Sequence, residues 1–308
     1  MLFGEEKEVS LGKKADISVI KEFGFYDNPS LQSYINQIGQ RLANLSSRSY
    51  LKFHFKLIDS PILNAFALPG GYIYISRGLI AEMNSEAQLA GVLAHEIGHV
   101  VCRHNINQLS QALSYQIITL AALAATPETR EMAAVTTSLF DSILKGYSRE
   151  KEFQADSIAV DLMQKAGYDV LEFANFFRNL ARKSQTPIGY AIYNATHPDI
   201  FERIRRVIVK EKLSYSMEKA LADSDMAEVK SPRFVGRKKY LKRLDGLVYG
   251  EKGRYSKLII YKTEPGDTFY GIAEKILGDP RKALEIAEFN EIDINTVLPA
   301  GIYVKVKY

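Results

Sequence analysis

The sequence predicts an α+β fold in which a mostly helical domain carries one small β-sheet and precedes a compact C-terminal unit. Apolar residues recur at helical spacing through most of residues 28–210, whereas alternation with period two is confined to short runs. Residues 257–308 then read as strand, helix, helix and strand, separated by Pro- and Gly-containing turns. We therefore expect two domains, at residues 1–250 and 257–308.

The N-terminal region is expected to be helical and then to form a β-ribbon. Asn28-Pro29 is typical of a helix start, with a capping side chain followed by proline at the first helical position. From residue 51 apolar residues alternate with Lys and His, which predicts a half-buried strand with His54 on its solvent face. A second strand is expected at residues 72–75, after a Pro-Gly-Gly turn.

The next helix carries the most informative motif. It opens with the capping box Ser85-Glu86-Ala87-Gln88, and residues 95–99 read His-Glu-Ile-Gly-His. Because a helix turns once every 3.6 residues, His95 and His99 project from one face and can share a tetrahedral zinc at about 2.0–2.1 Å. Glu96 lies beside them and is placed to act on a water molecule rather than on the metal.

A catalytic zinc site needs a third protein ligand and an open position. The candidates for this third ligand are His104, His197 and carboxylates. His54 is excluded because it is predicted to lie on the solvent face of its strand. Glu152 and Asp156 lie one turn apart on a predicted helix, so one could bind zinc while the other accepts a hydrogen bond from a ligand histidine. A solvated acidic face is the alternative. His104 is predicted to point away from the zinc, roughly 500° around the helix from His99.

Further helices are predicted over residues 106–125 and 128–144, from Ser148 to Gly167, over 169–183 and from Thr196 onward. The apolar stretch 112–125 is shorter than the roughly 20 residues that span a bilayer. Cys102 is the single cysteine, which excludes an intrachain disulfide, and we expect it to be a packed helical thiol.

Charge and the N-terminal residues give weaker guidance. A net charge of +4, without a recognisable motif, does not predict nucleic-acid binding. Seven basic residues fall between positions 230 and 243, either as a solvated helix or linker or as a contact for an anionic surface such as phospholipid or cell-wall polymer. No signal peptide opens the chain, so we expect a cytosolic protein or a mature form with a start methionine.

Taken together, the motifs resemble the HtpX/BepA-type zinc metallopeptidases, which are related to the prenyl-protein protease. The resemblance covers roughly residues 5–210. It is carried by the following segments in order: Asn64–Gly71 with Arg77-Gly78-Leu79, His95–His99, Arg103-His104, Ser148-Arg149 with Glu152 and Asp156, and Thr196-His197-Pro198 with Arg203.

This resemblance implies a gluzincin-type domain that binds one Zn²⁺ per chain through His95, His99 and Glu152, with Asp156 supporting the site. It also implies peptide hydrolysis, with Glu96 as the general base. His197 would be an active-site residue that either hydrogen-bonds the oxyanion or occupies the fourth zinc position. These two roles stay open.

Substrate binding is expected along one strand. Asn64, Ala65, Phe66 and Ala67 would form an edge strand that pairs with an extended substrate, a mode suited to unfolded or misfolded polypeptides. The alternative is that this segment is only a core strand.

The C-terminal unit resembles the LysM module, on the residues Tyr261, Pro265-Gly266-Asp267-Thr268, Ile272-Ala273, Ile286-Ala287, Asn290 and Leu298-Pro299-Ala300-Gly301. Phe269-Tyr270-Gly271 is unusual within that pattern. The resemblance implies binding of peptidoglycan, and the alternative is packing on the protease body.

The interpretation that follows is a periplasmic or cell-envelope zinc endopeptidase that degrades misfolded or stalled envelope proteins. Its substrates would be unfolded polypeptides, with peptidoglycan and a membrane surface as further partners. Two alternatives are a wall-tethered scaffold or chaperone whose zinc site is closed by His197, and a hydrolase of peptidoglycan peptide crosslinks.

Overall fold

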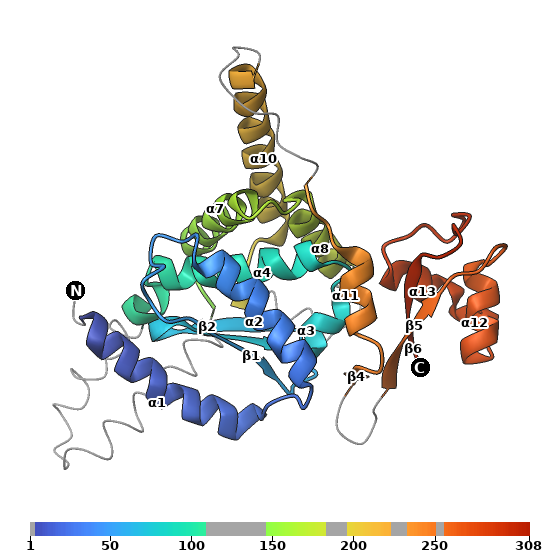
Figure 1. The fold of residues 1–308 in the computed structure, drawn as a ribbon, viewed down its shortest axis with the longest axis horizontal. Helices are drawn as coiled ribbons and strands as arrows, with labels where there is room; N and C mark the ends of the chain where they lie inside the picture. The colour runs from blue at the N-terminus through green and yellow to red at the C-terminus, as the bar shows by residue number, and fades with distance from the viewer. Residues whose placement is uncertain (1–3, 109–145, 183–195, 223–232, 251–255) are drawn as a thin grey trace.

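The computed structural model describes residues 4–108, 146–182, 196–222, 233–250 and 256–308. Its larger part is layered, with α1 on one face of a three-stranded sheet, α2 and α4 on the other face, then α7 and α8, and finally α10 projecting from the body (Figure 1). The helices of these layers are α1 (Glu5–Phe23), α2 (Pro29–Ala43), α3 (Arg77–Glu82), α4 (Glu86–Val101), α7 (Arg149–Lys165), α8 (Leu171–Arg182) and α10 (Ile200–Ala222).

The sheet has the order β1-β3-β2. β1 (His54–Ile58) pairs in parallel with β3 (Tyr72–Ser76), and β2 (Ala65–Leu68) pairs antiparallel with the other side of β3. The strands predicted at residues 51–57 and 72–75 do not form a ribbon with each other, because they run parallel and a tight turn cannot connect them. The predicted edge strand, β2, lies within their crossover and pairs antiparallel with β3 across the Pro-Gly-Gly turn. This arrangement places β2 at an edge of the sheet among the described strands.

The two predicted helix caps are confirmed. Asn28 Oδ1 accepts a hydrogen bond from the Leu31 amide at 3.0 Å, and Ser85 Oγ accepts one from the Gln88 amide at 3.1 Å. Both side chains satisfy amides that a helix start leaves without an intrahelical partner. The second cap begins α4, the helix that carries the His-Glu-Ile-Gly-His motif.

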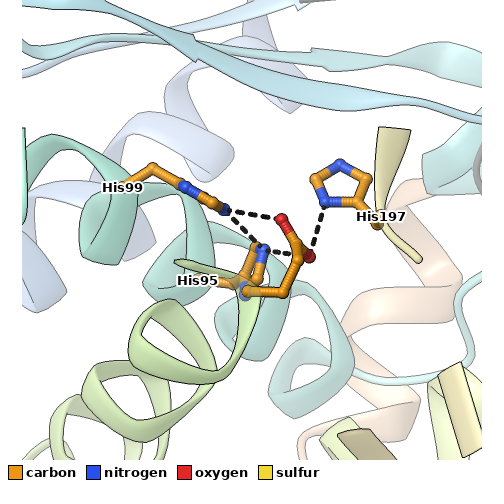
Figure 2. Close-up of side chains that lie close together, drawn as sticks. His95, His99 and His197 are labelled. Atoms are coloured by element: carbon orange, nitrogen blue, oxygen red, sulfur yellow. Dashed lines mark hydrogen bonds and ion pairs between the residues drawn. The ribbon is translucent and has the colours of Figure 1, made fainter. Parts of the chain in front are cut away.

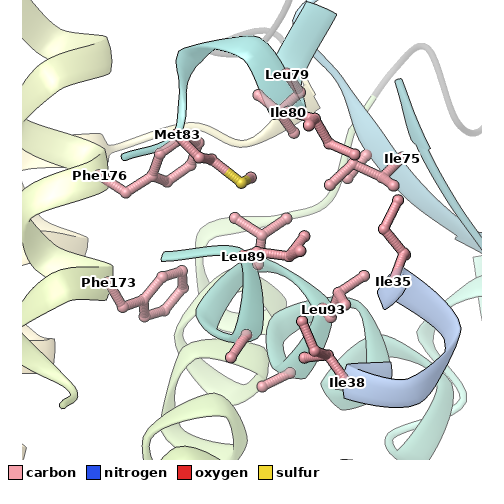
Figure 3. Packing of buried hydrophobic residues seen from close by; sticks show 14 of the residues in the cluster. Ile35, Ile38, Ile75, Leu79, Ile80, Met83, Leu89, Leu93, Phe173 and Phe176 are labelled. Atoms are coloured by element: carbon pink, nitrogen blue, oxygen red, sulfur yellow. The ribbon is translucent and has the colours of Figure 1, made fainter. Parts of the chain in front are cut away.

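Helix α4 passes through the centre of the hydrophobic core (Figure 3). Leu89 and Leu93 pack between side chains of α2 and side chains of α8, including Ile35 and Phe173. Every residue from Glu86 to Val100 is buried, which explains why apolar residues cover much of its circumference.

Gly98 lets α4 and α7 approach closely beside the metal motif. A Cβ at this position would lie 2.9 Å from both Cα and the carbonyl oxygen of Ala155 on α7. Such distances are too short for non-bonded atoms, so the glycine is required by packing. Helix α7 ends before Gly167, whose φ of 79° matches the predicted C-terminal cap.

The C-terminal unit has the predicted order of strand, helix, helix and strand. Its elements are β5 (Ser256–Lys262), α12 (Phe269–Leu277), the short helix η3 (Pro280–Lys282), α13 (Ala283–Phe289) and β6 (Tyr303–Lys307). β5 and β6 pair antiparallel, and a strand that was not predicted, β4 (Val248–Tyr249), joins the other side of β5. The division of the chain into two domains stays a prediction.

The C-terminal unit contacts the turn between α3 and α4 through buried polar groups. Lys305 is fully buried, and its ammonium donates hydrogen bonds to the carbonyls of Ala81 and Met83, each at 2.7 Å. The carboxylate of Glu291 accepts a hydrogen bond from the Asn84 side chain at 2.6 Å. The unit is thus hydrogen-bonded to the segment that starts the metal-motif helix.

The remaining predictions concern the basic run and the apolar segment. Helix α11 (Arg237–Arg243) carries most of the basic run between positions 230 and 243. Lys238, Lys239 and Lys242 are exposed, and Lys239 forms an ion pair with Glu86 at 3.3 Å. The helices predicted beyond residue 108 and up to 144 lie outside the described residues. Of the helices that are described, none combines the length and hydropathy needed to cross a bilayer.

Candidate metal centre

Four buried side chains from three segments converge on one point (Figure 2). His95 and His99 come from one face of α4, Glu152 from the first turn of α7, and His197 from just before α10. Each offers one potential ligand atom, and these four atoms all lie within 4.8 Å of one another. The cluster could hold one metal ion.

The spacing of the donor atoms fits zinc. Four ligands at about 2.0–2.1 Å from a tetrahedral ion lie about 3.3–3.4 Å from each other. The Nε2 atoms of His95 and His99 are 3.0 Å apart, and the carboxylate oxygens of Glu152 lie 3.4 and 3.3 Å from these two nitrogens. Oε1 of Glu152 is buried without a hydrogen-bond partner among the described residues. Two imidazoles and a carboxylate are ordinary zinc ligands.

Asp156 orients His95. Its carboxylate accepts a hydrogen bond from Nδ1 of His95 at 2.8 Å, so the lone pair of Nε2 faces the cluster. Burial opposes ionisation of Asp156, but the charge of Arg203 and hydrogen bonds from Arg203 and His95 hold its pKa below the usual value. The aspartate therefore stays an acceptor for the histidine.

Arg203 has a role in the centre that the sequence alone does not reveal. Its guanidinium donates to both oxygens of Asp156 at 2.8 Å, and Nη1 lies 3.0 Å from Glu152. It is fully buried and lies over the ring of Phe177 at 4.3 Å. Arg203 belongs to α10 and both carboxylates belong to α7, so no local pattern in the sequence reveals this contact.

His104 lies outside the donor cluster, as predicted, but it contacts His99, which an uninterrupted helix would not allow. Helix α4 ends at Val101, and Arg103 has a φ of 56°, so the chain leaves the helical path before residue 104. His104 consequently returns to His99, and their Nδ1 atoms are 3.0 Å apart. A positive φ at a non-glycine residue is uncommon, and the prediction assumed an uninterrupted helix.

Glu96 lies beside a narrow space at the cluster. The cavity has a volume of about 10 Å³, roughly one water molecule, and its lining is Asn64, Ala65, Phe66, Glu96, Tyr147, Thr196 and His197. Oε2 of Glu96 is buried and has no hydrogen-bond partner among the described residues. Burial raises the pKa of Glu96, whereas the charges of His197 and Arg203 outweigh burial and keep the pKa of Glu152 well below the usual value. The carboxyl group of Glu96 is thereby suited to take up a proton, and that of Glu152 to stay negatively charged beside a metal ion.

The outer edge of β2 faces this space. The carbonyl of Ala65 lies 3.4 Å from Nε2 of His197, and the carbonyl of Ala67 accepts a hydrogen bond from Asn105 Nδ2 at 2.5 Å. Asn64 and Phe66 line the same cavity as Glu96. All four residues predicted to bind substrate thus lie on or beside the strand next to the cluster.

Residues 29–210 match the family model of peptidase family M48. That match covers more than half of the chain. The chain belongs to peptidase family M48. Membership confirms the resemblance to zinc metallopeptidases at the level of the family, and with the donor cluster it confirms the expected class of metallopeptidase and one zinc ion as the cofactor.

Curated relatives extend the comparison. The beta-barrel assembly-enhancing protease of Escherichia coli (strain K12) is 33% identical over 184 residues, which cover 56% of this chain and 37% of that protein. A Vibrio cholerae protein that carries the same name provisionally is 35% identical over 187 residues, or 58% of this chain and 38% of its own length.

The mitochondrial metalloendopeptidase OMA1 of Schizosaccharomyces pombe is 28% identical over 204 residues, which cover 65% of this chain and 60% of that protein. The chain therefore spans less than two thirds of the length of each of these three relatives.

Proposed function

We propose that this protein is a zinc-dependent endopeptidase that hydrolyses unfolded or misassembled proteins of the cell envelope. One observation carries the proposal: the buried cluster of zinc-type donors lies beside Glu96, whose Oε2 has no hydrogen-bond partner among the described residues and which lines the same space. A purely structural zinc site is closed by its protein ligands and needs no such neighbouring base.

In this proposal His95, His99 and Glu152 hold the zinc. When bound, zinc supplies Lewis-acid polarisation of the scissile carbonyl and lowers the pKa of water toward about 7. Glu96 takes a proton from the attacking water and delivers it to the leaving amine, a role that its raised pKa supports. Asp156 keeps His95 in the tautomer that presents Nε2.

His197 is positioned to donate a hydrogen bond to the oxyanion that forms during amide hydrolysis. Its Nε2 lies 4.0 Å from Glu96 Oε1 and 3.4 Å from the Ala65 carbonyl, on the substrate side of the cluster. Its Nδ1 lies 3.1 Å from Glu152 Oε2, which also suits the second predicted role, that of a fourth ligand in a resting state. A zinc-loaded structure that shows His197 on the metal would favour the second role.

The substrate is expected to bind as an added strand along Asn64 to Ala67. An edge strand next to the catalytic residues supports this, because main-chain hydrogen bonds orient an extended peptide without requiring a particular sequence. His197 and Asn105 now contact the carbonyls of Ala65 and Ala67, so both contacts must exchange for substrate contacts. This binding mode favours unfolded polypeptides.

The test compares zinc-loaded wild type with Glu96→Gln on unfolded casein. We expect wild type to cleave and the variant to lose hydrolysis while it retains stoichiometric zinc, because glutamine cannot accept the proton. Glu22→Gln, an exposed position on α1, is the matched control and should cleave at the wild-type rate. Cleavage by Glu96→Gln at the wild-type rate would refute the assignment.

The periplasm or cell envelope is the proposed location, supported by the bacterial relatives whose names refer to β-barrel assembly. Fractionation of a bacterial host that expresses the full protein tests it. Recovery in the envelope or periplasmic fraction is expected, and recovery only with cytosolic markers would contradict the proposal.

We also propose that residues 257–308 form a LysM-like domain that binds peptidoglycan. The strand-helix-helix-strand order and the antiparallel β5–β6 pair support it. Co-sedimentation of the whole protein with purified sacculi is the test. We expect binding that weakens in Tyr270→Ala, an exposed aromatic side chain at the start of α12, and persists in Leu284→Ala, an exposed residue of α13. No sedimentation of the wild type would overturn this proposal.

A further inference from the structure

We propose that His104 and Gln154 orient His99 and select the tautomer that leaves its Nε2 free to bind zinc, through a chain of hydrogen bonds that runs from α7 to His99. The inference rests on the proposed role of His99 as a zinc ligand. His104 and Gln154 would be positioning residues, because they act through His99 and do not contact substrate.

The geometry consists of two short contacts in series. Nδ1 of His99 lies 3.0 Å from Nδ1 of His104, and Nε2 of His104 lies 3.0 Å from Oε1 of Gln154. His104 is only 3% exposed, whereas Gln154 is exposed on α7. We call this series the His99–His104–Gln154 chain.

The positions of the ring protons give the His99–His104–Gln154 chain one direction of hydrogen bonding. An amide oxygen only accepts, so Nε2 of His104 must carry the proton that it donates to Gln154. In a neutral His104 ring Nδ1 is then the acceptor, and Nδ1 of His99 must be the donor. His99 therefore has an unprotonated Nε2, which is the atom that faces His95 and Glu152.

If the hydrogen bonds ran in the opposite direction, His99 could not bind zinc through Nε2. If the Gln154 amide were turned so that its NH₂ group donated to His104, the proton on His104 would move to Nδ1 and His99 would carry its own proton on Nε2. A protonated Nε2 cannot bind zinc. The amide orientation at Gln154 is thus coupled to the ligand through two rings.

The two ligand histidines are consequently oriented in different ways. His95 donates to the carboxylate of Asp156, whereas the partner of His99 is a second imidazole with no formal charge. Tyr147 stacks on His99 at a centroid distance of 4.0 Å and limits rotation of the ring. Gln154 lies two residues after Glu152, so one turn of α7 supplies a ligand and also orients another ligand.

The test measures zinc affinity by chelator competition in wild type, His104→Ala, Gln154→Met and Gln154→Glu. Loss of an outer hydrogen-bond partner typically weakens metal binding about 10–100-fold, and we expect this range for His104→Ala. Gln154→Met keeps the length of the side chain but removes the acceptor, so affinity should also fall. Gln154→Glu restores an acceptor and should recover the affinity. His54→Ala, on β1 outside the cluster, is the matched control.

A spectroscopic readout separates positioning from a general structural effect. In the metal-free protein, ¹⁵N chemical shifts of the His99 ring should report the Nδ1–H tautomer in wild type and a mixture in Gln154→Met. Because Gln154 is exposed, this variant should fold like wild type, as circular dichroism would show.

Wild-type zinc affinity in both His104→Ala and Gln154→Met, or an unchanged tautomer in Gln154→Met, would overturn the inference. Failure of the wild type itself to bind zinc would instead refute the proposed function, so the two failures are distinguishable.

Discussion

Replacement of Gly98 by alanine tests whether the contact between α4 and α7 controls the metal centre. The new Cβ would lie 2.9 Å from two backbone atoms of Ala155, whereas carbon atoms ordinarily pack no closer than about 3.5 Å. The helices must therefore separate by about 0.6 Å at this level. Zinc sites tolerate about 0.2 Å in ligand distance, and Glu152 lies on the helix that is displaced.

The free energy of unfolding is expected to change little, because two effects oppose each other. Overpacking costs about 1–3 kcal/mol, and the better helix propensity of alanine returns about 1 kcal/mol. The net destabilisation of the metal-free protein is thus about 0–2 kcal/mol. The zinc affinity is the more sensitive quantity, and we expect it to fall about tenfold or more, which is about 1.4 kcal/mol or more.

Chelator competition measures the zinc affinity, and denaturant unfolding of the metal-free protein measures the stability. Gly271→Ala on α12 is the matched control, since its Cβ would meet only Thr268 Oγ1, at 3.5 Å. The control should retain wild-type affinity. If Gly98→Ala bound zinc as tightly as wild type, the argument that this contact sets the ligand geometry would be refuted.

Three further variants probe other contacts. Lys305→Met should lower the free energy of unfolding by about 2–4 kcal/mol, because two backbone carbonyls lose a buried charged donor; an unchanged urea midpoint would argue against the docking. Asp156→Asn should weaken zinc binding about 10–100-fold at a retained fold, and an unchanged dissociation constant in chelator competition would contradict its orienting role. Glu86 has a lowered pKa because hydrogen bonds from Tyr34 and Tyr168 overcome its burial, so its stabilising contribution is present above about pH 4.5 and disappears as the pH falls through its folded pKa. Unfolding curves between about pH 5 and 3 should therefore show a shallower loss of stability for Glu86→Gln than for wild type.

Local chemistry made part of the fold predictable. The caps at Asn28 and Ser85 satisfy amides within three residues, so the signal and its effect lie together in the sequence. The pairing of the strands was harder to predict, because the parallel pairing of β1 with β3 depends on a crossover and on the position of β2 in the sheet. A period-two pattern identifies a strand but not its neighbour.

The spacing of His95 and His99 determined by itself that two imidazoles share one helix face, because helix geometry places residues four apart together. The pair Glu152 and Asp156 was identifiable for the same reason, although only the resemblance distinguished a ligand from a solvated acidic face. Tertiary structure decided which side chains complete the centre. Arg203 on α10 contacts Asp156 on α7, and His104 contacts His99 only because the backbone adopts a positive φ at Arg103. Contacts between distant segments arise from packing of whole helices, so no residue pattern within one segment encodes them.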